Sequence, residues 1–85
     1  MLRNEWFSVL IKTAEQSSLQ VRVPKRVVKK ANRRNMVKRL VRDCFLHADK
    51  SKNFEVTVSC KAEFLKQDRV NVRIELTKIF EKGLT

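Results

Sequence analysis

The stretch RRNMVKRLVRDCF, residues 33–45, combines an apolar pattern with a charge pattern, and together they indicate a helix with two different faces. Its apolar side chains recur at the i, i+3, i+4, i+7 and i+8 positions of one stripe along a helix. They are Val37, Leu40, Val41, Cys44 and Phe45. Arg34, Lys38 and Arg42 share another face, because they are four residues apart. We therefore predict an amphipathic helix that begins within residues 29–32 and ends within residues 47–49.

The positive charge of the chain is concentrated around this helix. Residues 20–42 contain 10 of the 20 Lys and Arg residues and none of the 9 Asp and Glu residues. The other 62 residues balance 10 basic against 9 acidic side chains, so one segment supplies +10 of the net charge of +11. Like charges four residues apart destabilise a helix by a few tenths of a kcal/mol per pair. A basic segment without an acid among residues 20–42 therefore indicates an anionic partner, of which nucleic acid is the most common.

Three other segments show the alternation that is typical of β-strands. They are residues 6–13 and 19–23 before the helix and residues 54–60 after it, each with apolar side chains at every second position. The apolar rows are Phe7, Val9 and Ile11, then Val21 and Val23, then Phe54, Val56, Val58 and Cys60. One face of the resulting sheet is expected to be buried and the other open.

A second helix is predicted from Asp68, as its N-cap, to about residue 82, with Gly83 as the C′ residue that follows it. Its inner face carries Val72, Leu76, Ile79 and Phe80. The element order is then strand, strand, helix, strand, helix. This order predicts a small α+β fold, a two-layer sandwich with both helices on the apolar face of the sheet. We expect residues 1–85 to form a single domain.

Composition excludes several classes of protein. The chain has one glycine, so it cannot form a P-loop or a dinucleotide-binding loop, which need several. No apolar run approaches the roughly 20 residues that span a bilayer. The two cysteines lack CxxC spacing, which indicates reduced thiols and a cytoplasmic protein, with a Cys44–Cys60 disulfide as the alternative. Nothing in the sequence predicts a homo-oligomer.

The sequence favours RNA over DNA as the anionic partner. A helix-turn-helix needs two consecutive helices, whereas predicted strands flank the basic helix on both sides. An open sheet face beside a basic helix suits RNA, because a sheet can hold unstacked bases. A DNA-binding module or a module for anionic membranes remains a weaker alternative, since the apolar stripe of the helix is needed for the core.

The basic stretch resembles the signature of the bacterial ribonuclease P protein subunit. That family carries Arg-Asn-Arg, one residue, Lys-Arg, two residues and Arg, and here Arg34, Asn35, Lys38, Arg39 and Arg42 match while Met36 replaces the second arginine of the Arg-Asn-Arg triplet. VPKRVVKKA, residues 23–31, and FEVTVSCKA, residues 54–62, are similar to flanking segments of the family. The resemblance covers residues 6–84. The family usually begins with a further basic helix, so we expect a short or divergent member that lacks it, with an incomplete reading frame as the alternative.

This resemblance implies a fold and a function. The fold would contain a left-handed crossover between two parallel strands. The protein would bind the catalytic RNA and the precursor tRNA and assist removal of the tRNA 5′ leader, while the RNA performs the cleavage with Mg²⁺ and the protein binds no cofactor. The RNA-binding residues would be Lys25, Arg26, Lys29, Lys30, Arg33, Arg34, Asn35, Lys38, Arg39 and Arg42. The leader-binding face would hold Trp6, Ser8, Leu10, Lys12 and Arg22, although Trp6 and Leu10 could equally serve packing.

The main alternative is another domain that binds structured RNA, such as a ribosomal protein, with no role in processing. Catalysis by the polypeptide itself is not predicted. His47 is the one histidine and lies at the expected C-terminal end of a helix, where its side chain can interact favourably with the negative end of the helix dipole. One histidine and two separated cysteines are too few ligands for a zinc site. We therefore predict no catalytic residue and no metal ligand on the chain.

Overall fold

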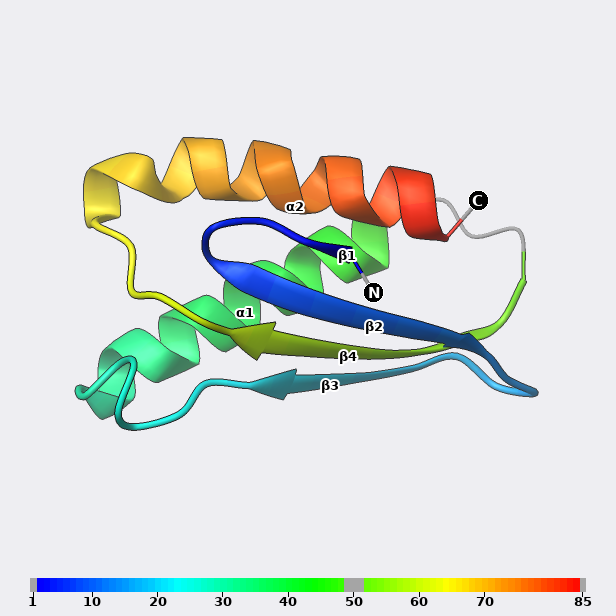
Figure 1. Ribbon diagram of the computed structural model, residues 1–85, viewed down its shortest axis with the longest axis horizontal. Helices are drawn as coiled ribbons and strands as arrows, with labels where there is room; N and C mark the ends of the chain where they lie inside the picture. Colours follow the sequence, from blue (N-terminus) through cyan, green and yellow to red (C-terminus); the bar gives the residue numbers. More distant parts are fainter. Residues whose placement is uncertain (1, 49–51, 85) are drawn as a thin grey trace.

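The structure, a computed structural model, describes residues 2–48 and 52–84. Its sheet has four strands in the order β1-β2-β4-β3 (Figure 1). The strands are β1 (Leu2–Arg3), β2 (Phe7–Thr13), β3 (Ser18–Arg22) and β4 (Phe54–Cys60). β2 is antiparallel to both β1 and β4, whereas β3 and β4 are parallel. The sheet is therefore mixed.

Two helices form the second layer. α1 (Ala31–His47) contacts β3, and α2 (Arg69–Gly83) contacts β1 and β2 and also packs against α1. A 3₁₀ turn, η1 (Lys66–Asp68), leads into α2. The predicted element order is confirmed, with β1 as an additional strand that the sequence analysis did not identify.

β1 exists because the chain reverses direction directly after it. The side-chain oxygen of Asn4 accepts hydrogen bonds from the backbone N–H groups of Trp6 and Phe7, at 2.9 and 2.8 Å. The N–H of Asn4 also donates to the carbonyl of Phe7. This asparagine turn folds the two-residue strand β1 back onto β2. β1 is too short to show alternation in the sequence.

The connection from β3 through α1 to β4 is left-handed. In Figure 1 both strands point to the left, β4 lies above β3, and α1 passes behind the sheet. When the strands are turned to point upward, the chain moves from left to right through a helix behind the sheet, which is the left-handed sense. About 98% of such connections are right-handed, so this topology is a distinctive feature of the fold.

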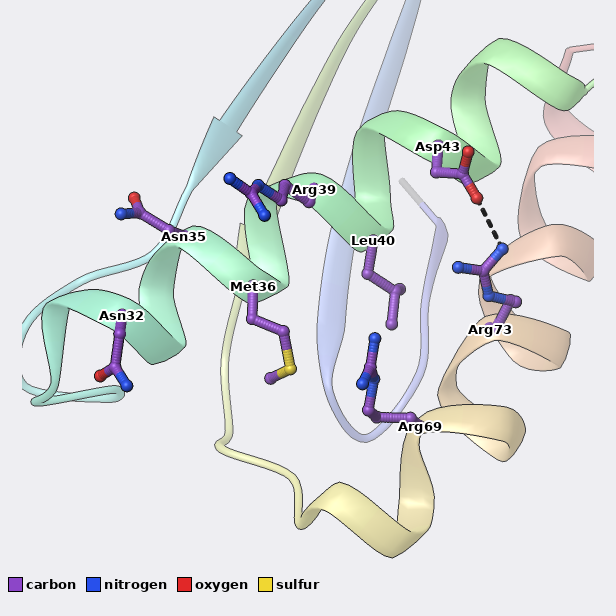
Figure 2. Close-up of a pocket in the computed structure, with 8 residues that line it drawn as sticks. All are labelled: Asn32, Asn35, Met36, Arg39, Leu40, Asp43, Arg69 and Arg73. Atoms are coloured by element: carbon purple, nitrogen blue, oxygen red, sulfur yellow. Dashed lines mark hydrogen bonds and ion pairs between the residues drawn. The ribbon is translucent and has the colours of Figure 1, made fainter.

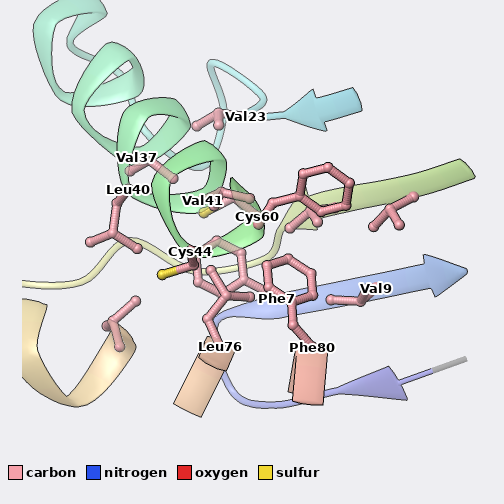
Figure 3. Packing of buried hydrophobic residues seen from close by; sticks show 14 of the residues in the cluster. Phe7, Val9, Val23, Val37, Leu40, Val41, Cys44, Cys60, Leu76 and Phe80 are labelled. Atoms are coloured by element: carbon pink, nitrogen blue, oxygen red, sulfur yellow. The ribbon is translucent and has the colours of Figure 1, made fainter. Parts of the chain in front are cut away.

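The core lies between the sheet and the two helices (Figure 3). The predicted stripe of α1 is confirmed, since Val37, Leu40, Val41, Cys44 and Phe45 are all buried. From the sheet and α2, fully buried side chains include Phe7, Val9, Val56, Val58, Val72, Leu76 and Phe80. The rings of Phe45 and Phe80 meet edge to face at 5.9 Å and join the two helices. Both layers are thus fixed by one continuous core.

The predicted start of α2 is confirmed, whereas its predicted end is corrected. Asp68 is the N-cap residue of α2, but its side chain makes no capping hydrogen bond, and its backbone angles are helical because it also ends η1. Gly83 is the last residue of α2 and does not have a positive φ. A Cβ at this position would meet the side-chain ends of Ile11 and Leu2. The glycine therefore allows α2 to approach β1 and β2 closely.

Both cysteines are free thiols and both are buried, so the disulfide alternative is not observed. Burial raises the pKa of the Cys44 and Cys60 thiols above the usual value, because the thiolate would lose its solvation. The two side chains therefore serve as small apolar core residues.

Candidate nucleic-acid interface

The solvent-facing side of α1 is cationic, and the first turn of the helix contains no acidic residue. Asn35, Arg39 and Arg42 are exposed, and Lys38 is half-buried. Lys30, the N-cap residue, has no side-chain hydrogen bond to the first turn. The positive end of the helix dipole and these cations therefore act in the same direction and favour an anion.

The connector before α1 extends this cationic surface. Its four basic residues, Lys25, Arg26, Lys29 and Lys30, are exposed. The carbonyl of Pro24 accepts hydrogen bonds from the N–H groups of Val27 and Val28, which form a turn. Val28 is fully buried, so this turn is anchored in the core while its charged side chains remain in solvent.

Two of the predicted RNA-binding arginines also hold the structure together. Arg33 donates from Nη2 to the carbonyl of Phe64 at 2.9 Å, and its Nε lies 3.4 Å from the carboxylate of Glu63. Arg34 donates from Nη1 to the carbonyls of Val28 and Lys29, at 3.1 and 2.8 Å. Arg33 thus ties α1 to the segment after β4, and Arg34 ties it to the connector. Sequence spacing gave no sign of either contact.

We predict that Arg33→Ala lowers the free energy of unfolding by about 1–2 kcal/mol, because the carbonyl of Phe64 loses a charged donor. Arg39→Ala should change it by less than about 0.5 kcal/mol, because Arg39 is exposed. Urea denaturation of the two variants measures both values. Equal stability of the two proteins would show that the Arg33 contacts are not maintained in solution.

The open face of the sheet carries polar side chains in aligned rows. Strand register places Arg3, Ser8, Ser59 and Arg22 in one row across the four strands. The next row holds Leu10, Thr57 and Gln20, and the third holds Lys12, Glu55 and Ser18. Leu10 is 40% exposed near the middle of this face. The structure therefore brings together four of the five predicted leader-binding residues and adds Arg3, which could be found only by recognising β1.

Trp6 lies apart from these rows. It precedes β2, is half-buried, and packs against the core cluster. Its carbonyl accepts a hydrogen bond from the N–H of Lys61 at 2.7 Å. The packing role considered for Trp6 from the sequence is therefore present in the structure.

The described residues offer little for other kinds of site. Within residues 2–48 and 52–84, no three His, Cys, Asp or Glu side chains gather in a way that could hold a metal ion. His47 is exposed, and its Nδ1 lies 2.8 Å from the carbonyl of Asp43 in the preceding turn. Neither helix in the described part of the chain is long and apolar enough to cross a bilayer.

The chain is similar to known proteins along nearly its whole length. The family model described as Ribonuclease P matches residues 2–83. The curated Ribonuclease P protein component of Pseudoalteromonas translucida (strain TAC 125) is 34% identical over 80 residues, which cover 91% of this chain and 57% of that protein. The chain therefore spans somewhat more than half the length of this relative.

The fold is also similar to solved structures. The RNase P protein from Thermotoga maritima matches with a TM-score of 0.73 and 28% identity, over 95% of this chain and 80% of that chain. The same protein in complex with 1-(4-fluorophenyl)-2-thiourea matches with a TM-score of 0.72 and 28% identity, over 95% and 82%. Because the family model covers nearly all of the sequence and the fold agrees, this chain belongs to the ribonuclease P protein family.

Proposed function

We propose that this chain acts as the protein subunit of ribonuclease P and, as a single RNA-binding domain, assists removal of the 5′ leader from precursor tRNA. The observation that carries the proposal is the family match over residues 2–83. The exposed cations of α1 and its connector agree with it, because they form one surface for a polyanion.

The catalytic RNA is the partner of the α1 surface in this proposal. Lys38, Arg39 and Arg42 contact backbone phosphates, and Asn35 donates a hydrogen bond beside them. Each phosphate that is neutralised releases condensed counterions, so binding weakens steeply as salt is added. The connector lysines and Arg26 continue this contact, whereas Arg33 and Arg34 mainly keep α1 in position through their backbone partners.

The 5′ leader of the precursor tRNA is the partner of the open sheet face. Arg3 and Arg22 stand at the two ends of one row, and adjacent strands are about 4.8 Å apart, so the two side chains flank a strip about 14 Å wide. Hydroxyl groups of Ser8 and Ser59 lie between them, and Leu10 supplies an apolar surface for a base. Such a face holds a single strand with little dependence on its sequence.

Cleavage belongs to the RNA in this proposal, and Mg²⁺ is bound by the RNA. The protein screens phosphate charge that would otherwise be screened by additional Mg²⁺. Its contribution should therefore be largest when Mg²⁺ is scarce.

Multiple-turnover cleavage of a precursor tRNA by a bacterial ribonuclease P RNA, at low Mg²⁺, tests the proposed function. We expect addition of the protein to stimulate cleavage at one site, the mature 5′ end. Tight RNA binding without stimulation would instead indicate a domain that binds structured RNA and has no processing role. An RNA with a scrambled sequence of equal length serves as the control for nonspecific binding.

The two surfaces should be separable by mutation. We predict that Arg22→Ala raises the KM for precursor tRNA several-fold while the affinity for ribonuclease P RNA stays within about twofold, because Arg22 lies on the open sheet face and outside α1. A substrate without a leader should show no difference between the variant and the unmodified protein. An equal rise in KM with both substrates would show that this face does not bind the leader.

A further inference from the structure

A groove of about 530 Å³ lies between α1 and α2 (Figure 2). Its α1 wall carries Asn32, Asn35, Met36, Arg39, Leu40 and Asp43, and its α2 wall carries Arg69 and Arg73. Figure 2 shows Met36 and Leu40 pointing from α1 toward the α2 side, where Arg69 stands. The groove therefore has an apolar floor and three arginines from two helices.

These arginines differ in whether their charge is already paired. Arg73 donates from Nη1 to the carboxylate of Asp43 at 2.6 Å, and this hydrogen bond raises the pKa of the Arg73 guanidinium. The same carboxylate lies 3.4 Å from Nδ1 of His47. Within residues 2–48 and 52–84, the side chains of Arg39 and Arg69 have no ion-pair or hydrogen-bond partner. Two unpaired guanidinium groups thus remain at the groove.

We infer that this groove binds the backbone of the RNA partner, with Arg39 on α1 and Arg69 on α2 as cationic contacts to two different phosphates. The inference rests on the proposed function, and it adds α2 to an RNA surface that otherwise consists of α1 and its connector. Guanidinium groups fit a phosphate because their planar donors can bind two of its oxygens. The amides of Asn32 and Asn35 supply neutral donors on the α1 wall.

A phosphate of a long RNA fits the surroundings better than a small free anion. A second hollow of about 470 Å³ continues from the groove and shares Asn32, Met36 and Arg69 with it. This hollow adds Arg33 and Lys66. Arg33 is paired with Glu63, so Arg69 and Lys66 are the cations that extend the surface from α1 toward η1. A path of this kind can follow several successive phosphates, and both hollows are open to solvent rather than closed around one ion.

Asp43 opposes this binding. It is the one acidic side chain among the described residues that line the groove, and it neutralises Arg73 there. Removal of its charge should therefore leave Arg73 as a third cation for the RNA backbone. This gives the inference a test in which a substitution strengthens binding, which a loss of folding cannot imitate.

The first test compares Arg69→Gln with Lys78→Gln in the full chain, by measuring affinity for a bacterial ribonuclease P RNA across a range of salt. Lys78 lies on α2 nine positions after Arg69, which is two and a half turns and therefore the opposite side of the helix. We expect Arg69→Gln to weaken binding about five- to tenfold and to reduce the slope of log K against log salt by about 0.9. Lys78→Gln should stay within about twofold. Equal effects of the two substitutions would overturn the inference.

The second test compares Asp43→Asn with Glu15→Gln, which removes an exposed negative charge from the turn between β2 and β3. This turn lies at the end of the sheet away from the starts of α1 and α2 (Figure 1). We expect Asp43→Asn to tighten binding about threefold to fivefold more than Glu15→Gln does. Equal tightening by the two variants would show that binding depends only on net charge, and it would overturn the inference. If the unmodified protein and the α1 variants behave as proposed while Arg69→Gln and Asp43→Asn match their controls, the inference fails alone. If the unmodified protein does not bind this RNA, the proposed function fails as well.

Discussion

Replacement of Val41 by aspartate is expected to unfold the domain at room temperature. Val41 is fully buried in the stripe of α1 that faces the sheet. A carboxylate there would have neither water nor a cationic partner, and burial of an unpaired charge costs several kcal/mol even when the charge is lost by protonation. A small domain has about 5 kcal/mol of total stability or slightly more, so one such change removes most of it.

Leu46→Asp is the matched control for this prediction. Leu46 lies on the same helix, five positions after Val41, and is 69% exposed. The same apolar-to-acidic change should therefore cost no more than about 1 kcal/mol there. Far-UV circular dichroism with thermal melting distinguishes the two variants. If the Val41→Asp protein is folded and melts at the same temperature as the Leu46→Asp protein, the helix faces are assigned wrongly.

Simultaneous replacement of Lys38, Arg39 and Arg42 by alanine is expected to reduce affinity for ribonuclease P RNA about a hundredfold near physiological salt. Each phosphate contact contributes a factor of about five under these conditions, because its counterion release scales with the logarithm of salt concentration. Arg39 and Arg42 are exposed and Lys38 is half-buried on the same side of α1. Stability should change by less than about 0.5 kcal/mol per site.

A variant with alanine at Lys52, Lys78 and Lys82 controls for net charge. These three side chains are exposed, lie outside α1 and its connector, and carry the same total charge as the α1 set. We expect this control to lose no more than about fivefold in affinity, through the general field of the protein. An equal loss in both triple variants would mean that the RNA senses overall charge and does not contact α1.

The sequence was most informative where one periodicity covered a whole element. Five buried positions of α1 follow directly from the helical repeat, and β4 follows from strict alternation. The ends of elements were less predictable, because they depend on contacts elsewhere in the fold. Gly83 belongs to α2, where the lack of a Cβ lets it approach Ile11 and Leu2. Asp68 occupies the N-cap position without a capping hydrogen bond, because a 3₁₀ turn precedes the helix.

The candidate site could be predicted only in part for a similar reason. The exposed cations of α1 and the connector are visible from the sequence, because they lie on one segment. The anchoring contacts of Arg33 and Arg34 depend on carbonyl groups that the fold brings close. Arg3 joins the open sheet face only through β1, and Arg69 joins Arg39 only because α2 packs beside α1. The left-handed crossover opposes the general rule and was implied only by family resemblance.

The salt dependence of binding to ribonuclease P RNA tests the central claim, that the cationic face of α1 neutralises RNA phosphates. Affinity is measured between about 50 and 300 mM salt for the unmodified protein and for the triple variant of Lys38, Arg39 and Arg42. The account predicts a slope of log K against log salt that is smaller by about 2–3 in the triple variant, since each lost contact removes about 0.9. Equal slopes for the two proteins would contradict it.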